Sequence, residues 1–341
     1  MAVKATLTQE KDAHPSRIGL VLDEVYLRHL AGNSGHPECP ERLLAIENAL
    51  REAGPLEALV RIPPRAATQE ELALAHSAAY LALVRSELLD LHGFAELSTG
   101  DTMVSPGSLK AANFAAGGVL EAVDAVMSGK VNAAFCAVRP PGHHATRARG
   151  MGFCIFNNVA VAARYIQQIY GLGRVLIVDW DYHHGNGTQD IFYGDGSVFY
   201  FSTHHFRAYP GTGHPSETGA EKGCGTTLNV PLPAGAGDEQ VLEAFQSKLV
   251  PAAQGFRPDF VLISAGFDGM RGDLLGCFDI TPPGFAAITR VVTRFANELC
   301  RGRVVSVLEG GYRLQGLGEC VVAHLRAMQT QREERPVARS A

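Results

Sequence analysis

The stretch Asp179-Trp-Asp-Tyr-His-His184 directly follows the apolar run Val175–Val178, and this junction is the clearest indication of the fold class. A short apolar run that ends abruptly in carboxylates and imidazoles is typical of a parallel strand buried on both faces. Three more junctions have this form: Ala134–Val138 before Arg139-Pro-Pro-Gly-His-His144, Val261–Ser264 before Ala265-Gly-Phe-Asp268, and Val304–Leu308 before Glu309-Gly-Gly-Tyr312. Ligands of parallel α/β sheets bind outside the carboxyl ends of the strands. We therefore predict that one edge of one sheet carries the polar residues His143, His144, Asp179, Asp181, His183, Asp268 and Tyr312.

Helical patterns surround and separate these strands. Apolar positions at helical spacing predict helices over Glu41–Glu52, Gln69–His76, Ala79–Leu91, Leu109–Ser128, Asn158–Tyr170, Asp238–Gly255, Pro283–Leu299 and Leu317–Gln329. Further strands are predicted at Ile18–Leu22, Val198–Ser202 and Thr227–Val230. Strands that alternate with helices from about residue 130 onward predict an α/β fold with a single open, mostly parallel sheet, in which long loops form the walls of the site. One domain is expected over residues 1–330, with a polar C-terminal tail over 331–341.

Composition limits the classes of function. The chain has 341 residues and a formal net charge of −5, which gives no electrostatic basis for stable nucleic-acid binding. Met1–His14 contains no apolar signal segment, and no apolar run reaches the roughly 18 residues of a membrane span. The seven cysteines are odd in number and contain no C-x-x-C pair, which indicates reduced thiols in a cytoplasmic protein. The sequence leaves the oligomeric state open, a homo-oligomer included.

Asp181, His183 and Asp268 are candidate metal ligands. Two ligands at i and i+2 can converge where a strand opens into a loop, and Asp268 comes from the end of another strand. Two aspartates and one histidine leave positions for water and substrate, as a catalytic Zn²⁺ requires. A dinuclear manganese site of the D-x-H-x-D kind is the alternative. Gly185 stands where that pattern needs its second aspartate, so the sequence favours one metal ion.

His143, His144 and Tyr312 are candidate catalytic groups. Imidazoles can remove a proton from water and donate one to a leaving amine. An aspartate behind a histidine fixes its tautomer, and Asp179 is the natural candidate for such a pair. Tyr312, on a glycine loop at a strand end, can stabilise a developing oxyanion.

With these residues assembled, the chain resembles the histone deacetylase superfamily from about Ile18 to Gln329. The resemblance rests on His36-Pro-Glu, Arg139-Pro-Pro-Gly-His-His-Ala145, Gly152-Phe-Cys154, Asp179-Trp-Asp-Tyr-His-His-Gly-Asn-Gly-Thr-Gln189, Gly266-Phe-Asp268 and Glu309-Gly-Gly-Tyr312. It is closer to the class II branch, as in bacterial histone-deacetylase-like amidohydrolases, which are related to the acetylpolyamine amidohydrolases. It implies the arginase–deacetylase fold, with helices on both faces of the sheet, and zinc-dependent hydrolysis of acetyl-lysine.

The resemblance also implies roles for individual residues. It makes Asp181, His183 and Asp268 the ligands of one zinc, His143 and His144 the tandem histidines, and Tyr312 the transition-state tyrosine. A monovalent cation, K⁺, is implied near Asp179, Ser202 and Thr203 and the backbone of Asp181 and His183. Substrate contacts are implied for the rim acid Asp101, the Gly152 carbonyl, and the channel walls Phe153 and Tyr209.

Three departures bear on activity and substrate. Asn186 stands behind the second histidine where class I enzymes have aspartate, which should leave His144 less basic. Tyr209 replaces the usual phenylalanine of the channel. Leu275 stands in the loop where polyamine-specific relatives carry a glutamate, which favours an acylated lysine peptide over a polyamine. Hydrolysis of an acetylpolyamine or another small acylamide is the alternative, and a non-catalytic acyl-lysine binder is a third reading.

Overall fold

The computed structural model describes residues 17–33, 35–54 and 59–329. Within these ranges, one eight-stranded sheet has the order β2-β1-β5-β10-β9-β6-β7-β8, and all its neighbouring strands are parallel. Its strands are β1 (Ile18–Val21), β2 (Leu59–Arg61), β5 (Ala133–Cys136), β6 (Val175–Asp179), β7 (Val198–His205), β8 (Thr227–Leu232), β9 (Phe260–Ala265) and β10 (Val304–Leu308). A separate antiparallel pair joins β3 (Ala95–Glu96) and β4 (Met103–Val104). The predicted fold class is confirmed, whereas the predicted tail at 331–341 lies outside the described residues.

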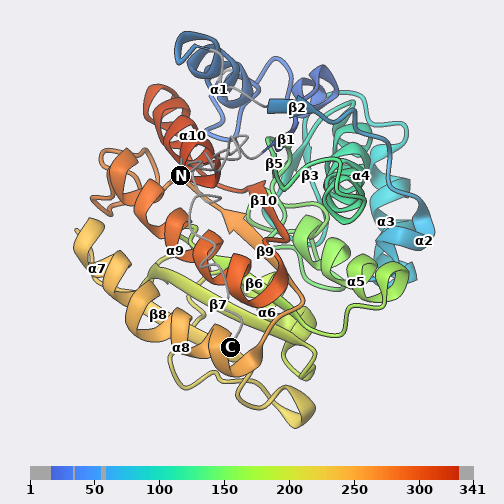
Figure 1. The fold of residues 1–341 in the computed structure, drawn as a ribbon. Helices are drawn as coiled ribbons and strands as arrows, with labels where there is room; N and C mark the ends of the chain where they lie inside the picture. Colours follow the sequence, from blue (N-terminus) through green and yellow to red (C-terminus); the bar gives the residue numbers. More distant parts are fainter. Residues whose placement is uncertain (1–16, 34, 55–58, 330–341) are drawn as a thin grey trace, which may run out of the picture.

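Helices cover both faces of the sheet (Figure 1). One face carries α4 (Ser108–Met127) and α5 (Asn158–Tyr170), and the other carries α9 (Pro282–Cys300) and α10 (Leu314–Gln329). The other helices are α1 (Glu41–Glu52), α2 (Gln69–Leu72), α3 (Ala78–Leu88), α6 (Asn186–Phe192), α7 (Asp238–Ala244) and α8 (Val250–Phe256). Short segments of other helical type are η1 (Glu24–Arg28), η2 (Glu221–Gly223) and η3 (Phe245–Leu249).

The four strands that end in polar clusters are the four central strands of the sheet. They are neighbours in the order β5-β10-β9-β6, and every residue in them is buried. This burial on both faces explains why their sequences are continuous apolar runs rather than alternating ones. Because all four are parallel, their carboxyl ends meet at one edge, as the sequence predicts.

Two predicted helices differ most from the observed ones; in addition, α3 ends at Leu88 rather than Leu91, and α10 begins at Leu314 rather than Leu317. The helix predicted over Gln69–His76 ends at Leu72, because the chain turns so that the His76 ring, which is buried, contacts the backbone of Thr146 and Asn157. The helix predicted over Asp238–Gly255 is divided by the π-helical turn η3. Pro251 has no N–H and its ring would collide with the carbonyl four residues earlier, which explains why the backbone widens just before it.

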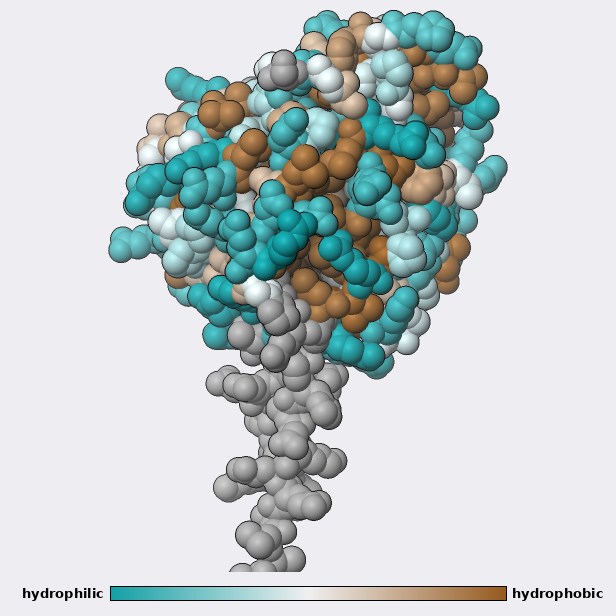
Figure 2. All heavy atoms as spheres, turned by 90° about the horizontal axis from the view of Figure 1, so that it is seen from above, coloured by the Kyte–Doolittle hydropathy of each residue, from teal (hydrophilic) through white to brown (hydrophobic). Residues whose placement is uncertain are grey.

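Seen from above, the surface mixes hydrophilic side chains with apolar ones that gather toward the middle of this face (Figure 2). In the described part of the chain, no helix has the length and apolar character to cross a membrane.

Candidate active site

The three predicted metal ligands converge at the carboxyl ends of β6 and β9. Asp181, His183 and Asp268 offer donor atoms that all lie within 4.8 Å of one another. Nδ1 of His183 lies 2.8 Å from Asp268 Oδ2 and 3.3 Å from Asp181 Oδ1. The other Asp181 oxygen accepts the Gly310 N–H at 2.8 Å, and Asp268 Oδ1 accepts the Tyr182 N–H at 2.9 Å. The structure therefore brings together the three residues that the sequence predicts as ligands.

The donor set fits a divalent cation. Asp179, Asp181 and Asp268 are fully buried, and the ion-pair partners of the last two are histidines. Burial, and then the Asp181 carboxylate, raise the pKa of Asp268 to about 7. A buried group of carboxylates is stable only when positive charge compensates it. One imidazole and two carboxylates are also the ligand types that Zn²⁺ accepts.

The tandem histidines lie beside this cluster, and each has a different partner. Nδ1 of His143 lies 3.0 Å from Asp179 Oδ2, and Nδ1 of His144 lies 2.8 Å from Asn186 Oδ1. Burial opposes protonation of His143, but Asp181, Asp179 and Glu309 outweigh it and raise its pKa to about 10. Burial, and then His143 and His183, hold the pKa of His144 well below its usual value. The two rings, whose centroids are 4.0 Å apart, therefore differ strongly in basicity.

Glu309 supports the tandem-histidine loop, a role that the sequence analysis did not assign. This fully buried carboxylate accepts the N–H groups of Gly142 at 2.7 Å and His143 at 3.1 Å. Its other oxygen accepts the Ser264 hydroxyl at 3.0 Å. The signal that could have revealed Glu309 is its position, since it follows β10 directly as the other site residues follow their strands.

Tyr312 reaches the site through a glycine pair. A Cβ at Gly310 would lie 2.4 Å from Asp268 Oδ2, so only glycine lets the backbone pass this close to the ligands. Gly311 has a φ of +117°, which side chains rarely tolerate. Behind the loop, Arg42 donates to the carbonyls of Gly311 at 2.7 Å and Glu309 at 2.5 Å.

A buried ion-pair network anchors the loops that carry Tyr312 and the tandem histidines. The Arg42 guanidinium is 5.0 Å from the centre of the Tyr312 ring and 3.0 Å from Glu38 Oε1. Glu38 also accepts both Nε and Nη2 of Arg139, the residue that opens the tandem-histidine loop. All three charged side chains are fully buried, which ties the loops of Tyr312 and His143 to one carboxylate.

The predicted channel residues surround the approach to the cluster. The Phe153 ring lies 6.0 Å from the Tyr312 ring, and the Tyr209 ring lies 5.1 Å from the His144 ring. Asp101 Oδ1 accepts the Gly152 N–H at 2.8 Å and the Tyr209 hydroxyl at 3.3 Å. The Gly152 carbonyl accepts the thiol of Cys154 at 3.3 Å.

The remaining predicted positions lie at the rim and behind β6. Leu275 is 40% exposed in the loop after Asp268, and its neighbour Leu274 is 67% exposed. Ser202 is the sheet partner of Asp179, and its hydroxyl lies 2.9 Å from Nδ1 of His204. Thr203 follows on the same strand and is buried.

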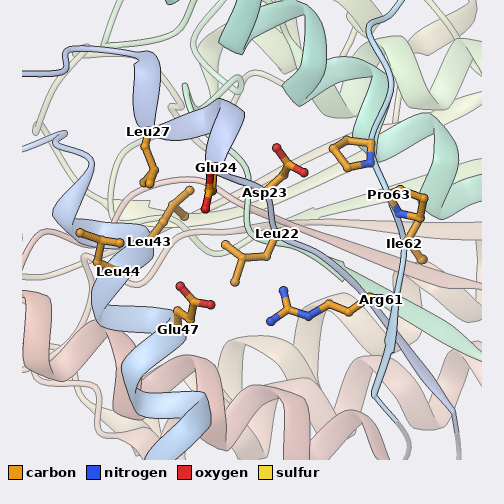
Figure 3. A pocket seen from close by; sticks show the side chains of 11 residues that line it. Leu22, Asp23, Glu24, Leu27, Leu43, Leu44, Glu47, Arg61, Ile62 and Pro63 are labelled. Atoms are coloured by element: carbon orange, nitrogen blue, oxygen red, sulfur yellow. The ribbon is translucent and has the colours of Figure 1, made fainter.

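A separate hollow of about 490 Å³ lies at the carboxyl ends of β1 and β2 (Figure 3). It is lined by leucines, Ile62 and two prolines, with Asp23, Glu24, Glu47 and Arg61 as its charged members. The Asp23 carboxylate already has a hydrogen-bond partner within the protein, because it accepts the Val25 N–H at 2.9 Å. None of its lining residues belongs to the strand-end cluster, so we assign no substrate to it.

A parallel α/β sheet whose central strands end in carboxylates, histidines and a tyrosine is typical of a metallohydrolase. The chain belongs to the histone deacetylase domain family, whose model matches residues 36–328. It is 41% identical over 310 residues to Histone deacetylase 15 of Arabidopsis thaliana, covering 89% of this chain and 55% of that protein. It is 43% identical over 293 residues to the Polyamine deacetylase HDAC10 of Mus musculus, covering 83% of this chain and 43% of that protein.

A solved structure supports the fold independently. The crystal structure of the HDA15 HD domain superposes with a TM-score of 0.84 at 39% identity, over 92% of this chain and 91% of that chain. The predicted arginase–deacetylase fold and the superfamily resemblance are thus confirmed. The chain spans about half the length of the two proteins compared above.

Proposed function

We propose that this protein is a zinc-dependent deacylase that hydrolyses N-ε-acetyl-lysine to lysine and acetate. The observation that carries the proposal is the meeting of Asp181, His183 and Asp268 with His143, His144 and Tyr312 at one sheet edge. Membership of the histone deacetylase domain family supports the same reaction. We further propose one catalytic domain over residues 1–330, a cytoplasmic location, and a K⁺ ion held by Asp179, Ser202, Thr203 and the backbone carbonyls of Asp181 and His183.

Zinc held by Asp181, His183 and Asp268 would lower the pKa of a water molecule and polarise the amide carbonyl. His143 has its Nδ1 on Asp179, so its Nε2 is the atom that can exchange a proton with water. The Asn186 amide oxygen only accepts, so Nδ1 of His144 carries the hydrogen, and its unprotonated Nε2 can take up a proton that water releases and pass it on to the leaving amine. The Tyr312 hydroxyl donates to the carbonyl oxygen as negative charge develops there.

The test of this proposal is a substrate panel. Purified zinc-loaded protein is given acetyl-lysine peptides, longer acyl-lysine peptides and acetylated polyamines, each with and without a chelator. We expect release of acetate from the acetyl-lysine peptides, its loss with chelator and its recovery on adding zinc. Hydrolysis that is unaffected by removal of the metal would refute the zinc-dependent reaction.

Hydrolysis of an acetylpolyamine is the second candidate function, because the chain is 43% identical to a Polyamine deacetylase. The rim argues against it, since exposed Leu274 and Leu275 offer nothing to offset the desolvation of a polyamine's ammonium groups. We expect kcat/KM for acetyl-lysine peptides to exceed that for N8-acetylspermidine, and Leu275→Glu to narrow or invert the ratio. Leu274→Glu is the matched control, since it adds the same charge one residue away. A wild-type preference for the polyamine of about tenfold, or 1.4 kcal/mol, would make the second function the better one.

Asp101 should distinguish peptides from small amides. It lies at the channel mouth, where Oδ1 holds Gly152 and Tyr209 and the carboxylate can also accept N–H groups of an extended peptide. We expect Asp101→Ala to lower kcat/KM for peptides about tenfold more than for a small acetamide, the effect of a lost charged hydrogen bond. Tyr209→Phe removes only the internal bond and is the control. Equal losses on both substrates would show that Asp101 merely supports the loop.

A further inference from the structure

Tyr312 is held on both sides of its loop by carboxylates. Before it, the Gly310 N–H is bonded to Asp181. The N–H of Tyr312 itself and that of the next residue, Arg313, both donate to Asp273 Oδ2, at 2.7 and 3.0 Å. Hydrogen bonds to a carboxylate are among the stronger ones in proteins. Since the glycine pair before Tyr312 supplies little stiffness, these contacts fix where its backbone lies.

Few contacts of the Tyr312 side chain fix the direction of its hydroxyl. Within the described residues, its hydroxyl forms no hydrogen bond, and its ring packs against Phe153 and the Arg42 guanidinium. The direction of the hydroxyl therefore depends on the backbone of residues 310–313. A small shift of that backbone would move the hydroxyl away from the place where it is needed.

Asp273 belongs to the rim loop that follows the ligand Asp268. Its second oxygen accepts the N–H groups of Leu275 at 2.9 Å and Gly276 at 3.3 Å. The base of this loop is closed by backbone bonds between Gly269 and Ile280 and between Arg271 and Ile280. A Cβ at Gly276 would lie 1.8 Å from the Asp268 carbonyl, so the loop returns closely over the ligand. The Asp273 carboxylate thus joins the rim loop to the tyrosine loop, as does the Arg313 side chain, which donates to the Arg271 carbonyl at 2.8 Å.

We propose that Asp273 is a positioning residue that keeps Tyr312 in its productive place and couples this place to the conformation of the rim loop. The inference rests on the proposed function, in which Tyr312 acts on the amide carbonyl. Because the Asp273 carboxylate contacts backbone N–H groups of the two loops, it acts through Tyr312 rather than on the substrate. A substrate that presses on Leu275 would shift the Asp273 carboxylate, and this shift would reach the backbone of Tyr312.

A double-mutant cycle tests the kinetic part. The zinc-loaded protein is measured as wild type, Asp273→Ala, Tyr312→Phe and the double variant on one acetyl-lysine peptide. We expect Asp273→Ala to lower kcat about tenfold to a hundredfold, the effect of a small misplacement, with KM changed less than about threefold. In the Tyr312→Phe background, the same substitution should change kcat less than about twofold, because its target is already gone. Equal losses in both backgrounds, or loss of bound zinc in Asp273→Ala, would overturn the proposal.

Amide hydrogen exchange tests the clamp without any reaction. We expect the segment containing Tyr312 and Arg313 to exchange faster in Asp273→Ala than in wild type, and unchanged exchange would overturn the proposal. If the alanine variant does not fold, Asp273→Asn takes its place, since its single oxygen can serve only one of the two loops. Asp279→Asn is the matched control, because Asp279 pairs with Arg271 in the same loop at 2.6 Å and contacts neither Tyr312 nor Arg313. A wild type that binds zinc but cleaves no amide would refute the proposed function, while the exchange result still decides the clamp.

Discussion

Replacing Asp181 with alanine should abolish bound zinc and amide hydrolysis together. The substitution removes one of two charged ligands and also frees the two N–H groups that its carboxylate holds, those of His183 and Gly310. A three-ligand site that loses a carboxylate retains metal poorly, because the remaining ligands cannot hold it against solvent. We expect less than about a tenth of an equivalent of zinc after dialysis and hydrolysis at the background rate. Metal analysis, peptide hydrolysis and thermal unfolding on the same sample measure this.

Asp190→Ala is the matched control for that experiment. Asp190 is exposed on α6, close in sequence to Asp181 and outside the strand-end cluster. Its loss should leave both zinc content and turnover unchanged. If Asp181→Ala kept about one equivalent of zinc and turned over normally, Asp181 would not be a ligand and the metal site would have to be placed elsewhere.

The sequence predicts the centre of the sheet well because burial there is complete. A short continuous apolar run at such a junction indicates a strand that is buried on both faces. The strands β5, β6, β9 and β10 all lie where those runs are found. The edge strand β2 has no such signal, since its three residues, Leu59–Arg61, are partly or fully exposed. Asn186–Phe192 begins with Asn-Gly, which usually favours a turn. It forms α6 because Gly187 packs on the Ala145 carbonyl and the Thr188 N–H bonds the His143 carbonyl.

Within the site, residues at strand ends could be predicted from the sequence, whereas the residues that hold the loops could not. The predicted ligands and catalytic groups follow strand ends, so parallel topology alone brings Asp181 and Asp268 together. The groups that hold the loops have no such rule. Asp273 accepts the Tyr312 N–H although the two residues are 39 positions apart in the sequence, and Glu38 pairs with Arg139 at a separation of 101 positions. These pairs depend on loop paths that neither propensity nor periodicity describes, which is why the partners of Asp273 and Glu38 emerge only from the structure.

Tyr312→Phe should keep the metal and lose about a hundredfold or more in kcat, which is typical of a lost oxyanion donor. The phenyl ring can still pack against Phe153 and Arg42, so the loop and the channel should persist. The hydroxyl matters most as charge develops on the carbonyl oxygen, so KM should change much less than kcat. Tyr209→Phe is the matched control, because it removes a channel hydroxyl that bonds Asp101 rather than the reacting amide, and it should change kcat less than about threefold. Steady-state kinetics with zinc analysis of both variants decides the role of Tyr312. A loss of kcat below about tenfold in Tyr312→Phe would make Tyr312 a packing residue rather than the oxyanion donor.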